Sequence, residues 1–312
     1  MKLIALLIGL LIERLATQLF HLRELRWLDR VIDAGCYRIA KLTRWPPLIP
    51  VLLLAILLVL PVFLVTLLLG DTLFGFPYLL LAVGVLFFSL GPKDIAEEVD
   101  DYCSAVESDD AERIRITAKA LLERDVPEDA WRRISEVEEA VFVQANNRLF
   151  AVVFWFVLLG PLGAWSYRVT DLIRRRAVFQ AARDADHRND DDDDDGNDND
   201  DGIAGAANAL HSWLAWVPAR LTACGYALAG SFDDAFAVWR GAPEQQAAST
   251  GERSDQLLAR VGVASLALLP LDDENEASRA IRGATAANRL VFRLLLLWAV
   301  VIASMTLYGW SV

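Results

Sequence analysis

Charged and amide side chains beside long apolar runs are the residues of this sequence best placed to do chemistry. Such groups are costly in or next to a bilayer, so they usually face a bundle interior or a wet cavity and pair with one another. Their mixture of carboxylate, amide, Lys and Arg suits a phosphate-bearing or amide-rich ligand held by guanidinium groups and helix N-termini. For each residue, the alternative is a snorkelling helix end or an ion pair within the chain. The candidate ligand-binding residues are Glu13, Lys93, Asp94, Glu139, Asn146, Asn147, Arg148 and Arg220.

Other motifs of catalysis or metal binding are missing from the sequence. There is no P-loop, no nucleophile–His pair and no zinc-type spacing, so we expect no catalytic residue, metal or cofactor. The histidines are isolated and are predicted to be interfacial or solvated; they are His21, His187 and His211. The cysteines are odd in number and far apart, which predicts ordinary small core residues; they are Cys36, Cys103 and Cys224.

The composition indicates an integral membrane protein. The 312 residues are 55% hydrophobic, and the mean hydropathy is +0.33. Four apolar runs contain no charged side chain and are long enough to span a bilayer: residues 51–69, 74–90, 149–165 and 294–310. The apolar opening stretch lacks a small-residue cleavage site and is predicted to be a retained N-terminal helix. The net charge of −12 makes nucleic acid an unlikely partner.

Charge bias predicts the sidedness of the first half of the chain. Residues 21–44 hold six Arg and Lys side chains against three acidic ones, which places them in the cytoplasm. The apolar hairpin that follows returns the chain, so residues 92–147 are expected there too. Within them, apolar spacing predicts three helices, the third opening at Pro127-Glu128-Asp129. The predicted core positions are Ile95, Val99, Cys103, Val106, Ile114, Ile116, Ala120 and Leu121.

The apolar run of residues 149–165 contains its own break. Gly160-Pro161-Leu162-Gly163 interrupts it, and Asn146-Asn147 is a plausible helix-breaking pair before it. Arg174-Arg175-Arg176 follows this run closely, and the rule that positively charged loops stay on the cytoplasmic side would keep these arginines in the cytoplasm. The segment either dips in and returns or is followed by a second crossing, so the sidedness of residues 169–289 stays open.

The Asp-rich stretch of residues 184–202 has the composition of a disordered, solvated linker. Beyond it, Trp213 and Trp216 suit a membrane interface, and Pro218 suits the first turn of a new helix. Arg220 would then stand near a helix N-terminus, where the helix dipole disfavours a cation unless an anion is near.

The predicted fold is all-α: a polytopic inner-membrane helical protein with a small cytoplasmic helical domain and broken or re-entrant membrane segments. It divides into an N-terminal amphipathic helix and basic segment, a transmembrane hairpin, the cytoplasmic helical domain, a broken transmembrane segment, an acidic disordered linker, an amphipathic interface segment, a polar helical region and a C-terminal transmembrane helix. Their bounds are 1–46, 47–91, 92–147, 148–168, 169–208, 209–240, 241–289 and 290–312.

Short motifs at the ends of the apolar runs carry a resemblance to a known family. In chain order they are "ERL", "FSLGPKDIAEEV", "NNR", "LLGPLGAWSYR" and "WLAWVPARLTACGYALAG". In this series the sequence resembles the AmpE family over nearly the whole chain, except for the Asp-rich segment and about residues 241–289. The resemblance implies an inner-membrane signalling modulator of β-lactamase induction and the cell-wall-damage response. It also places the chain in the superfamily of the CobD/CbiB cobalamin-biosynthesis proteins.

Departures from the cobalamin branch bear on whether the chain is an enzyme. Those proteins carry a motif of the form E-S-x-x-E-N-T-x-D-G where this chain has "EAVFVQANNR". Glu139 is kept, but Val143, Gln144, Asn147 and Arg148 replace the second Glu, Asn, Asp and Gly. Carboxylates that could hold a magnesium–nucleotide or a phosphate-bearing amine are therefore mostly missing.

Two functions remain in view. The first is a non-catalytic inner-membrane regulator, embedded in the lipid bilayer, that senses an unidentified small ligand or a membrane or cell-wall pathway protein. The second is a membrane-bound amide-forming enzyme on another substrate, which alone would use a Mg²⁺–nucleotide. Under the first, we predict that Glu139, Asn147, Arg148 and Arg220 meet in a cavity at the cytoplasmic membrane surface.

Overall fold

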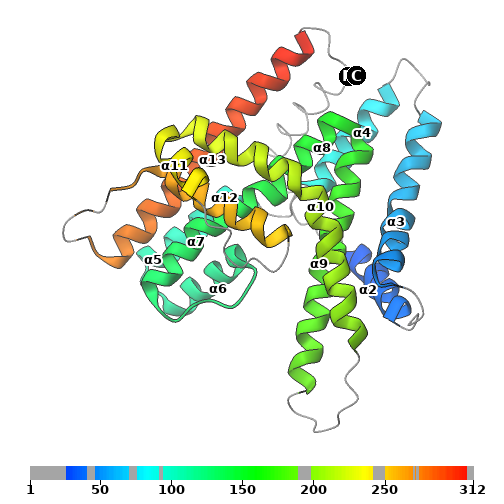
Figure 1. The fold of residues 1–312 in the computed structure, drawn as a ribbon, viewed down its shortest axis with the longest axis horizontal. Coiled ribbons are helices and arrows are strands. Elements are labelled where there is room, and N and C mark those ends of the chain that lie inside the picture. Colours follow the sequence, from blue (N-terminus) through cyan, green and yellow to red (C-terminus); the bar gives the residue numbers. More distant parts are fainter. Residues whose placement is uncertain are drawn as a thin grey trace. The chain divides into compact units, whose positions relative to one another are not determined.

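A computed structural model describes residues 26–40, 46–69, 76–90, 94–188, 198–241, 250–269, 271 and 274–307. Within these ranges every regular element is a helix, which confirms the all-α class (Figure 1). The predictions for the N-terminal helix, Glu13 and Lys93 lie outside the described residues. The chain forms two compact units, residues 1–92 with 152–215 and residues 93–151 with 216–312.

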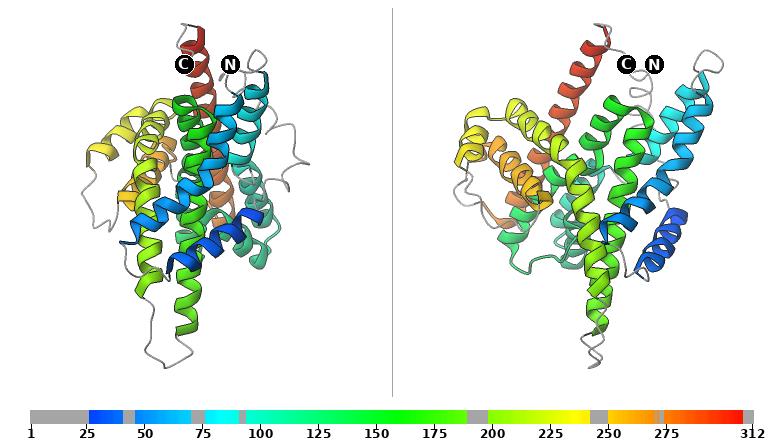
Figure 2. Two further views of the ribbon diagram at one scale, coloured as in Figure 1. Left: turned by 90° about the vertical axis from the view of Figure 1, so that its right-hand side faces the viewer. Right: turned by 45° about the vertical axis from the view of Figure 1, so that its right-hand side comes forward.

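The first unit is organised around one long helix, α9 (Pro161–Arg188). It packs against α2 (Arg26–Ala40), α3 (Leu48–Leu69) and α4 (Phe76–Ser89) (Figure 2). The first part of α10 (Asp198–Ala229) adds to the same apolar core. The central side chains of this core are Ile32, Val51, Leu54, Val169, Ile173 and Ala207.

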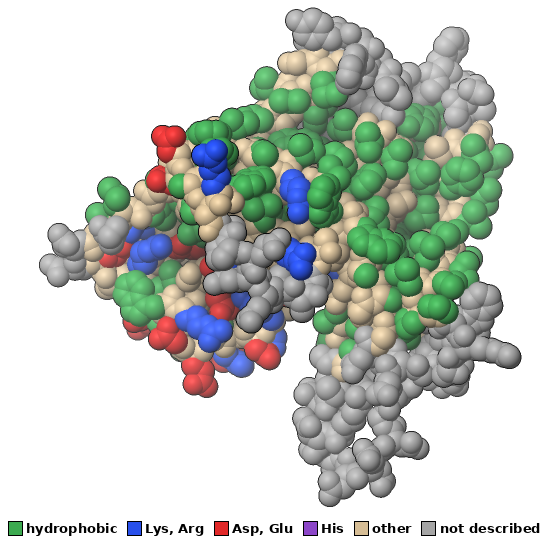
Figure 3. Space-filling model, in the orientation of Figure 1, with side chains coloured by type: hydrophobic (Ala, Val, Ile, Leu, Met, Phe, Trp, Pro, Cys, Tyr) green, Lys and Arg blue, Asp and Glu red, His purple; other side chains and the backbone are tan. Residues whose placement is uncertain are grey.

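Helix α3 has the character of a membrane span. It carries no charged residue, and leucines around its surface are exposed, among them Leu53, Leu57 and Leu68 at 60%, 61% and 75%. Figure 3 shows hydrophobic side chains gathered over this part of the molecule, whereas acidic and basic ones gather over α5 (Ile95–Glu107) and α6 (Ala111–Leu122). An apolar surface of this kind, on a helix long enough to cross a bilayer, is typical of contact with lipid.

Length and composition identify three candidate spans among the described helices, together with a shorter apolar helix. The spans are Leu48–Leu68, Ala130–Leu159 and Glu276–Met305, and the shorter helix is Pro77–Ser89. All four apolar runs predicted from the sequence thus lie in these helices, in whole or in part. The last two spans begin well before the predicted runs, because polar first turns continue into the apolar helices without a break.

The second unit joins the predicted helical domain to the C-terminal helices. It contains α5, α6, α7 (Ala130–Ala145), α11 (Phe232–Gly241), α12 (Thr250–Leu266) and α13 (Glu276–Leu307). Helix α7 is central and packs against α6, α12 and α13. The Tyr226 hydroxyl donates to the Phe142 carbonyl oxygen at 3.0 Å, which ties the end of α10 to α7 in the core.

The three helices predicted within residues 92–147 are present, and each begins at an aspartate. Asp94, Asp110 and Asp129 accept hydrogen bonds from backbone N–H groups of the first turns, as N-cap residues do. In α5 all four predicted core positions are buried. In α6 the predicted face is partly wrong: Ile116 is 58% exposed and Ala120 is exposed too, while Ala118, Leu121 and Leu122 are buried.

The predicted break lies at Gly160 and not at the asparagines. Residues 146–150 form a π-helical turn (η3, Asn146–Phe150) that joins α7 directly to α8 (Ala151–Leu159). Gly160 has φ of 71°, a left-handed conformation that ends α8, and Pro161 opens α9. A Cβ on Gly163 would overlap the Trp155 carbonyl, so the turn between α8 and α9 requires this second glycine as well.

Two further predictions are wrong in their local structure. The linker expected over residues 169–208 is helical over 169–188 and 198–208, leaving residues 189–197 outside the described ranges. Pro218 lies inside α10 and opens no new helix. Proline removes the bond to the carbonyl four residues earlier, and here the Trp155 indole donates to that Leu214 oxygen at 3.1 Å.

Helix α3 also contains an interior proline, Pro61, with a tryptophan hydrogen bond beside it. In the turn before Pro61, the Leu58 carbonyl accepts a hydrogen bond from the Trp165 indole at 3.1 Å. Pro61 removes the helical bond to the Leu57 carbonyl, one residue earlier, so this indole bonds the carbonyl next to the freed one.

Candidate functional site: the buried Arg148 network

Arg148 is the centre of a buried ionic network in the second unit. Its Nη1 donates to Glu98 Oε2 and its Nη2 to Glu123 Oε1, each at 2.8 Å, and its Nε donates to Gln144 Oε1 at 3.1 Å. The side chains of Arg148 and Glu98 are only 7% and 8% exposed, and that of Glu123 is 26% exposed. We call these four residues the Arg148 network.

Four elements position the Arg148 network. Gln144 stands one turn before Arg148, so both side chains lie on one face, and the π turn then carries Arg148 itself. Glu98 comes from the first turn of α5. Glu123 is the left-handed C-cap of α6, at φ 55°, a conformation that costs a non-glycine residue about 1–2 kcal/mol. The ion pair with Arg148 helps to offset that strain.

The geometry of the Arg148 network is that of an internal clamp. The Arg148 guanidinium bridges the carboxylates of Glu98 and Glu123 on two other helices, and its Nε–H donates to the side-chain amide oxygen of Gln144. The neighbouring amides are also buried, and Asn146 Nδ2 donates to Asn147 Oδ1 at 3.0 Å. For Arg148 the structure therefore favours the alternative left open by the sequence, an ion pair within the chain.

The other candidate residues have varied surroundings. Asp94 is exposed and caps α5, with Oδ1 accepting from the Ala96 N–H at 3.1 Å. Glu139 is half-buried, whereas its neighbour Glu138 is 2% exposed and forms a bidentate ion pair with Arg279. Sequence reasoning thus selected the less buried member of this carboxylate pair.

Arg220 stacks on an aromatic ring within its own helix. Its guanidinium carbon lies 3.9 Å from the centroid of the Trp216 ring, and Nη1 donates to the Trp216 carbonyl at 3.1 Å. Because α10 is continuous here, Arg220 is not at a helix N-terminus, which removes the electrostatic argument for an anion beside it. Its convergence with Glu139, Asn147 and Arg148 stays a prediction.

A second ionic cluster, in the first unit, was missed by the sequence analysis. Asp171 is fully buried and accepts from Arg168 Nη1 at 3.1 Å, Arg174 Nη2 at 2.9 Å and Arg175 Nε at 2.9 Å. Burial opposes its charged form, but Arg175, Arg174 and Arg168 outweigh that effect and hold the pKa of the Asp171 carboxyl far below its usual range. The spacings of three and four residues along α9 were the signal that could have revealed it.

His211 belongs to this second cluster, so the prediction of a solvated or interfacial histidine is wrong. Its side chain is 7% exposed, its ring lies 5.3 Å from that of Tyr167, and Nε2 is 3.7 Å from Asp171 Oδ1. Burial, together with the charge of Arg174, lowers the pKa of His211 to about 3. The histidine is therefore neutral at physiological pH.

Within the described residues, no three His, Cys, Asp or Glu side chains are grouped so that they could hold a metal ion. The cysteines also differ in part from their prediction, because Cys36 and Cys103 are buried but Cys224 is exposed.

An all-α chain with span-length apolar helices and buried ion pairs inside its helical units is an integral membrane protein. The family model described as "Regulatory signalling modulator protein AmpE" matches residues 1–312, and the chain belongs to the AmpE family.

Two curated relatives carry a different description. The chain is 27% identical over 157 residues to a cobalamin biosynthesis protein CobD of Stutzerimonas stutzeri, covering 50% of this chain and 46% of the relative. It is 23% identical over 163 residues to the CobD of Chromobacterium violaceum, covering 52% and 47%. The chain thus spans about half the length of these relatives. No solved structure matches it.

Proposed function

We propose that this protein is a non-catalytic signalling modulator of β-lactamase induction in the bacterial inner membrane. The observation that supports this best is the Arg148 network, because Arg148, Gln144 and two carboxylates are engaged with one another. Polar groups at a catalytic centre need to face a substrate, whereas a buried clamp fixes the arrangement of helices. The small ligand or pathway protein that such a regulator senses would act by favouring or opening this clamp.

In this proposal the helices of residues 94–147 lie in the cytoplasm, where an acidic helical surface can meet a partner. The positive-inside bias of residues 21–44 supports that side. Reporter fusions after Asp125 test it: cytoplasmic-type activity is expected, and periplasmic-type activity contradicts the topology.

The role of the Arg148 network is tested in cells that carry an inducible β-lactamase. Glu98→Gln keeps the size of the side chain but removes the charge that faces Arg148. We expect it to change the induction response to a β-lactam at an unchanged level of protein in the membrane. Glu112→Gln is the matched control, since Glu112 pairs with Arg115 on the exposed face of α6. An unchanged induction response in E98Q contradicts a role for the network in signalling.

A second candidate function is a membrane-bound amide-forming enzyme, favoured by the similarity to the CobD relatives over half of the chain. In that case a Mg²⁺–nucleotide would bind near Glu139, the residue that matches the superfamily motif. Mass spectrometry of small molecules retained on the detergent-purified chain separates the two candidates, because only the enzyme would retain a nucleotide.

A further inference from the structure

A pocket lined by charges of both signs lies in the second unit. Its volume is about 380 Å³, within the usual range of small-molecule sites of about 300–1,000 Å³. It is formed by the second half of α5, the loop that follows, and the first turns of α6, α7 and α13. No residue of the Arg148 network lines it. Its charged, aromatic and aliphatic lining includes Tyr102, Asp109, Ile114, Arg133, Ile134 and Glu276.

The charged side chains of this pocket do not pair with one another. Arg133 on α7 is positive, whereas Asp109 and Glu276 are negative. Within the described residues none of the three forms an ion pair. Their neighbours on the same helices do pair, as Arg132 and Arg282 show. Opposite charges that line one pocket without meeting leave a place for an occupant that carries both charges.

Arg133 is positioned to receive an anionic group. Its Nη1 donates to the Pro127 and Glu128 carbonyl oxygens, each at 3.4 Å, which anchors the side chain at the start of α7. Burial raises the pKa of Tyr102 to about 12, although the charge of Arg133 and its hydrogen bond with the hydroxyl oppose this effect. A protonated hydroxyl therefore stands beside the guanidinium. Because a guanidinium has five N–H donors, Arg133 retains donors for a carboxylate.

The acidic side of the pocket suits an amine. Asp109 lies between α5 and α6, and Glu276 stands in the first turn of α13; both residues are exposed. Two carboxylates against one guanidinium give these side chains a net negative charge. A phosphate or nucleotide would be repelled by them, whereas an ammonium group is attracted. Aliphatic side chains such as Ile114 and Ile134 can cover an apolar part of the occupant.

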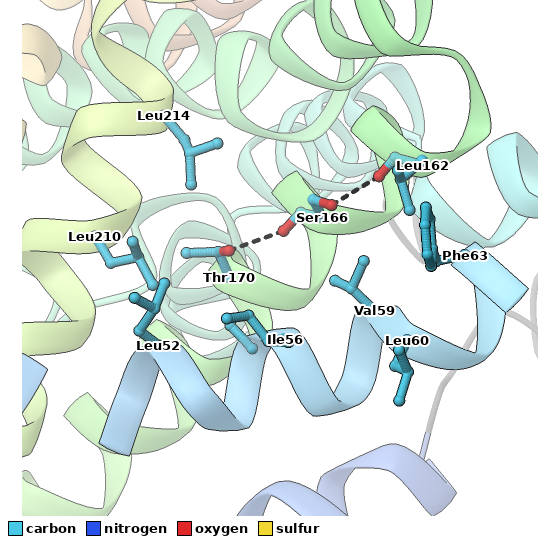
Figure 4. A pocket seen from close by; sticks show the side chains of 11 residues that line it. Leu52, Ile56, Val59, Leu60, Phe63, Leu162, Ser166, Thr170, Leu210 and Leu214 are labelled. Carbon is cyan, nitrogen blue, oxygen red and sulfur yellow. Dashed lines mark hydrogen bonds between the residues drawn. The ribbon is translucent and has the colours of Figure 1, made fainter. Parts of the chain in front are cut away.

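The apolar groove of the first unit, between α3, α9 and α10, lacks these features (Figure 4). Ser166 Oγ donates to the Leu162 carbonyl at 2.7 Å, and Thr170 Oγ1 donates to the Ser166 carbonyl at 2.8 Å. Both hydroxyl hydrogens are thus directed into α9, and the rest of the lining is apolar. No side chain in this groove distinguishes one ligand from another.

We propose that the pocket of the second unit binds a zwitterion of the amino-acid class, either a free amino acid or a short peptide. The carboxylate of this ligand lies at Arg133, and its ammonium group lies at Asp109 and Glu276. The binding site stands without the signalling role. As the ligand sensed by a regulator, the zwitterion rests on the proposed function.

The test is isothermal titration calorimetry of the full chain, purified in detergent, with free leucine and with the dipeptide alanyl-leucine. Saturable binding of at least one of them is expected, with a Kd in about the micromolar to millimolar range. The N-acetyl derivative of the compound that binds lacks the ammonium charge, and its amide lacks the carboxylate. Each derivative should bind about tenfold more weakly, because it loses a hydrogen bond between charged groups.

Substitutions assign each charge of the ligand to its side of the pocket. Arg133→Gln should weaken binding of the zwitterion about tenfold but leave binding of the amide unchanged, since the amide has no carboxylate to lose. Unchanged binding of the amide also shows that the variant is folded. Arg132→Gln is the matched control, because Arg132 is 72% exposed, pairs with Glu136 and does not line the pocket.

The acidic side is tested by Asp109→Asn combined with Glu276→Gln. This variant should weaken binding of the zwitterion about tenfold and leave binding of the N-acetyl derivative unchanged. Glu112→Gln is its control, since Glu112 pairs with Arg115 on the exposed face of α6.

Three outcomes would overturn the binding site: no binding of leucine or alanyl-leucine, equal binding of the zwitterion and both derivatives, or equal effects of R133Q and R132Q. The sensing role is judged separately, by β-lactamase induction in cells. An R133Q variant that has lost binding but keeps a normal induction response would contradict sensing and leave the site in place.

Discussion

Replacing Arg148 with methionine should destabilise the second unit strongly. The substitution keeps an unbranched side chain of similar length but removes the guanidinium that bonds Glu98, Glu123 and Gln144. Glu98 is 8% exposed, so its charge would be left buried without its main partner. Breaking a buried ion pair from one side costs about 3–5 kcal/mol. The expected loss in free energy of unfolding lies in that range.

The assay is reversible unfolding of the purified chain in mixed micelles, followed by circular dichroism. A second variant, R148M/E98Q, removes the stranded charge and should recover about 1–3 kcal/mol of the loss. Arg115→Met is the matched control: Arg115 also pairs with a glutamate, but both side chains are about two-thirds exposed, at 67% and 65%. Exposed pairs contribute little, so no resolvable change is expected there. A loss in R148M no greater than that in R115M would refute the reasoning.

Three further predictions follow from other parts of the structure. The pKa of His211 is about 3 in the folded protein and about 6.5 in the unfolded chain. The free energy of unfolding should therefore fall as the pH drops below 6.5, by about 2 kcal/mol between pH 7 and pH 5. His211→Gln should flatten this pH dependence in melting experiments, and an unchanged slope would contradict the prediction. Gly160→Ala should lower the free energy of unfolding by about 1–2 kcal/mol in thermal denaturation, because φ at Gly160 is 71°. Gly84→Ala in α4, where a new Cβ meets open space, should be neutral or stabilising in the same assay. Equal effects of the two substitutions would contradict the strain argument. Trp155→Phe removes the donor to the Leu214 carbonyl and should lower the free energy of unfolding by about 1–2 kcal/mol. Adding Pro218→Ala to this variant restores a backbone donor and should recover part of the loss. If the effect of the double variant is the simple sum of the two single effects, the two residues are not coupled.

The sequence was sufficient for the features that depend on local pattern. Uncharged apolar runs identified the spans, and apolar spacing identified the three helices α5, α6 and α7. The glycine and proline at 160 and 161 marked the end of one helix and the beginning of the next. Each of these signals acts over one or two turns and needs no knowledge of distant contacts.

Partners from distant parts of the chain could not be predicted in the same way. Glu98 is 50 residues from Arg148. Apolar spacing puts Glu98 nearer the buried face of α5 than the exposed Glu97, but it does not identify the partner. Pro218 was assigned to a helix start because the sequence gives no sign that Trp155 would bond the freed carbonyl. The asparagine pair was assigned to a break because a π turn has no sequence pattern of its own.

The cysteines of this chain give it a ready-made chemical label. Cys36 and Cys103 are buried, and Cys224, in the second half of α10, is exposed. Where that surface of α10 meets water, a thiol reagent would modify this single position without any prior mutagenesis. Comparing a membrane-impermeant maleimide on intact cells and on opened vesicles would report which face of the bilayer that position occupies, and so fix one point in residues 169–289, whose sidedness charge counting leaves open.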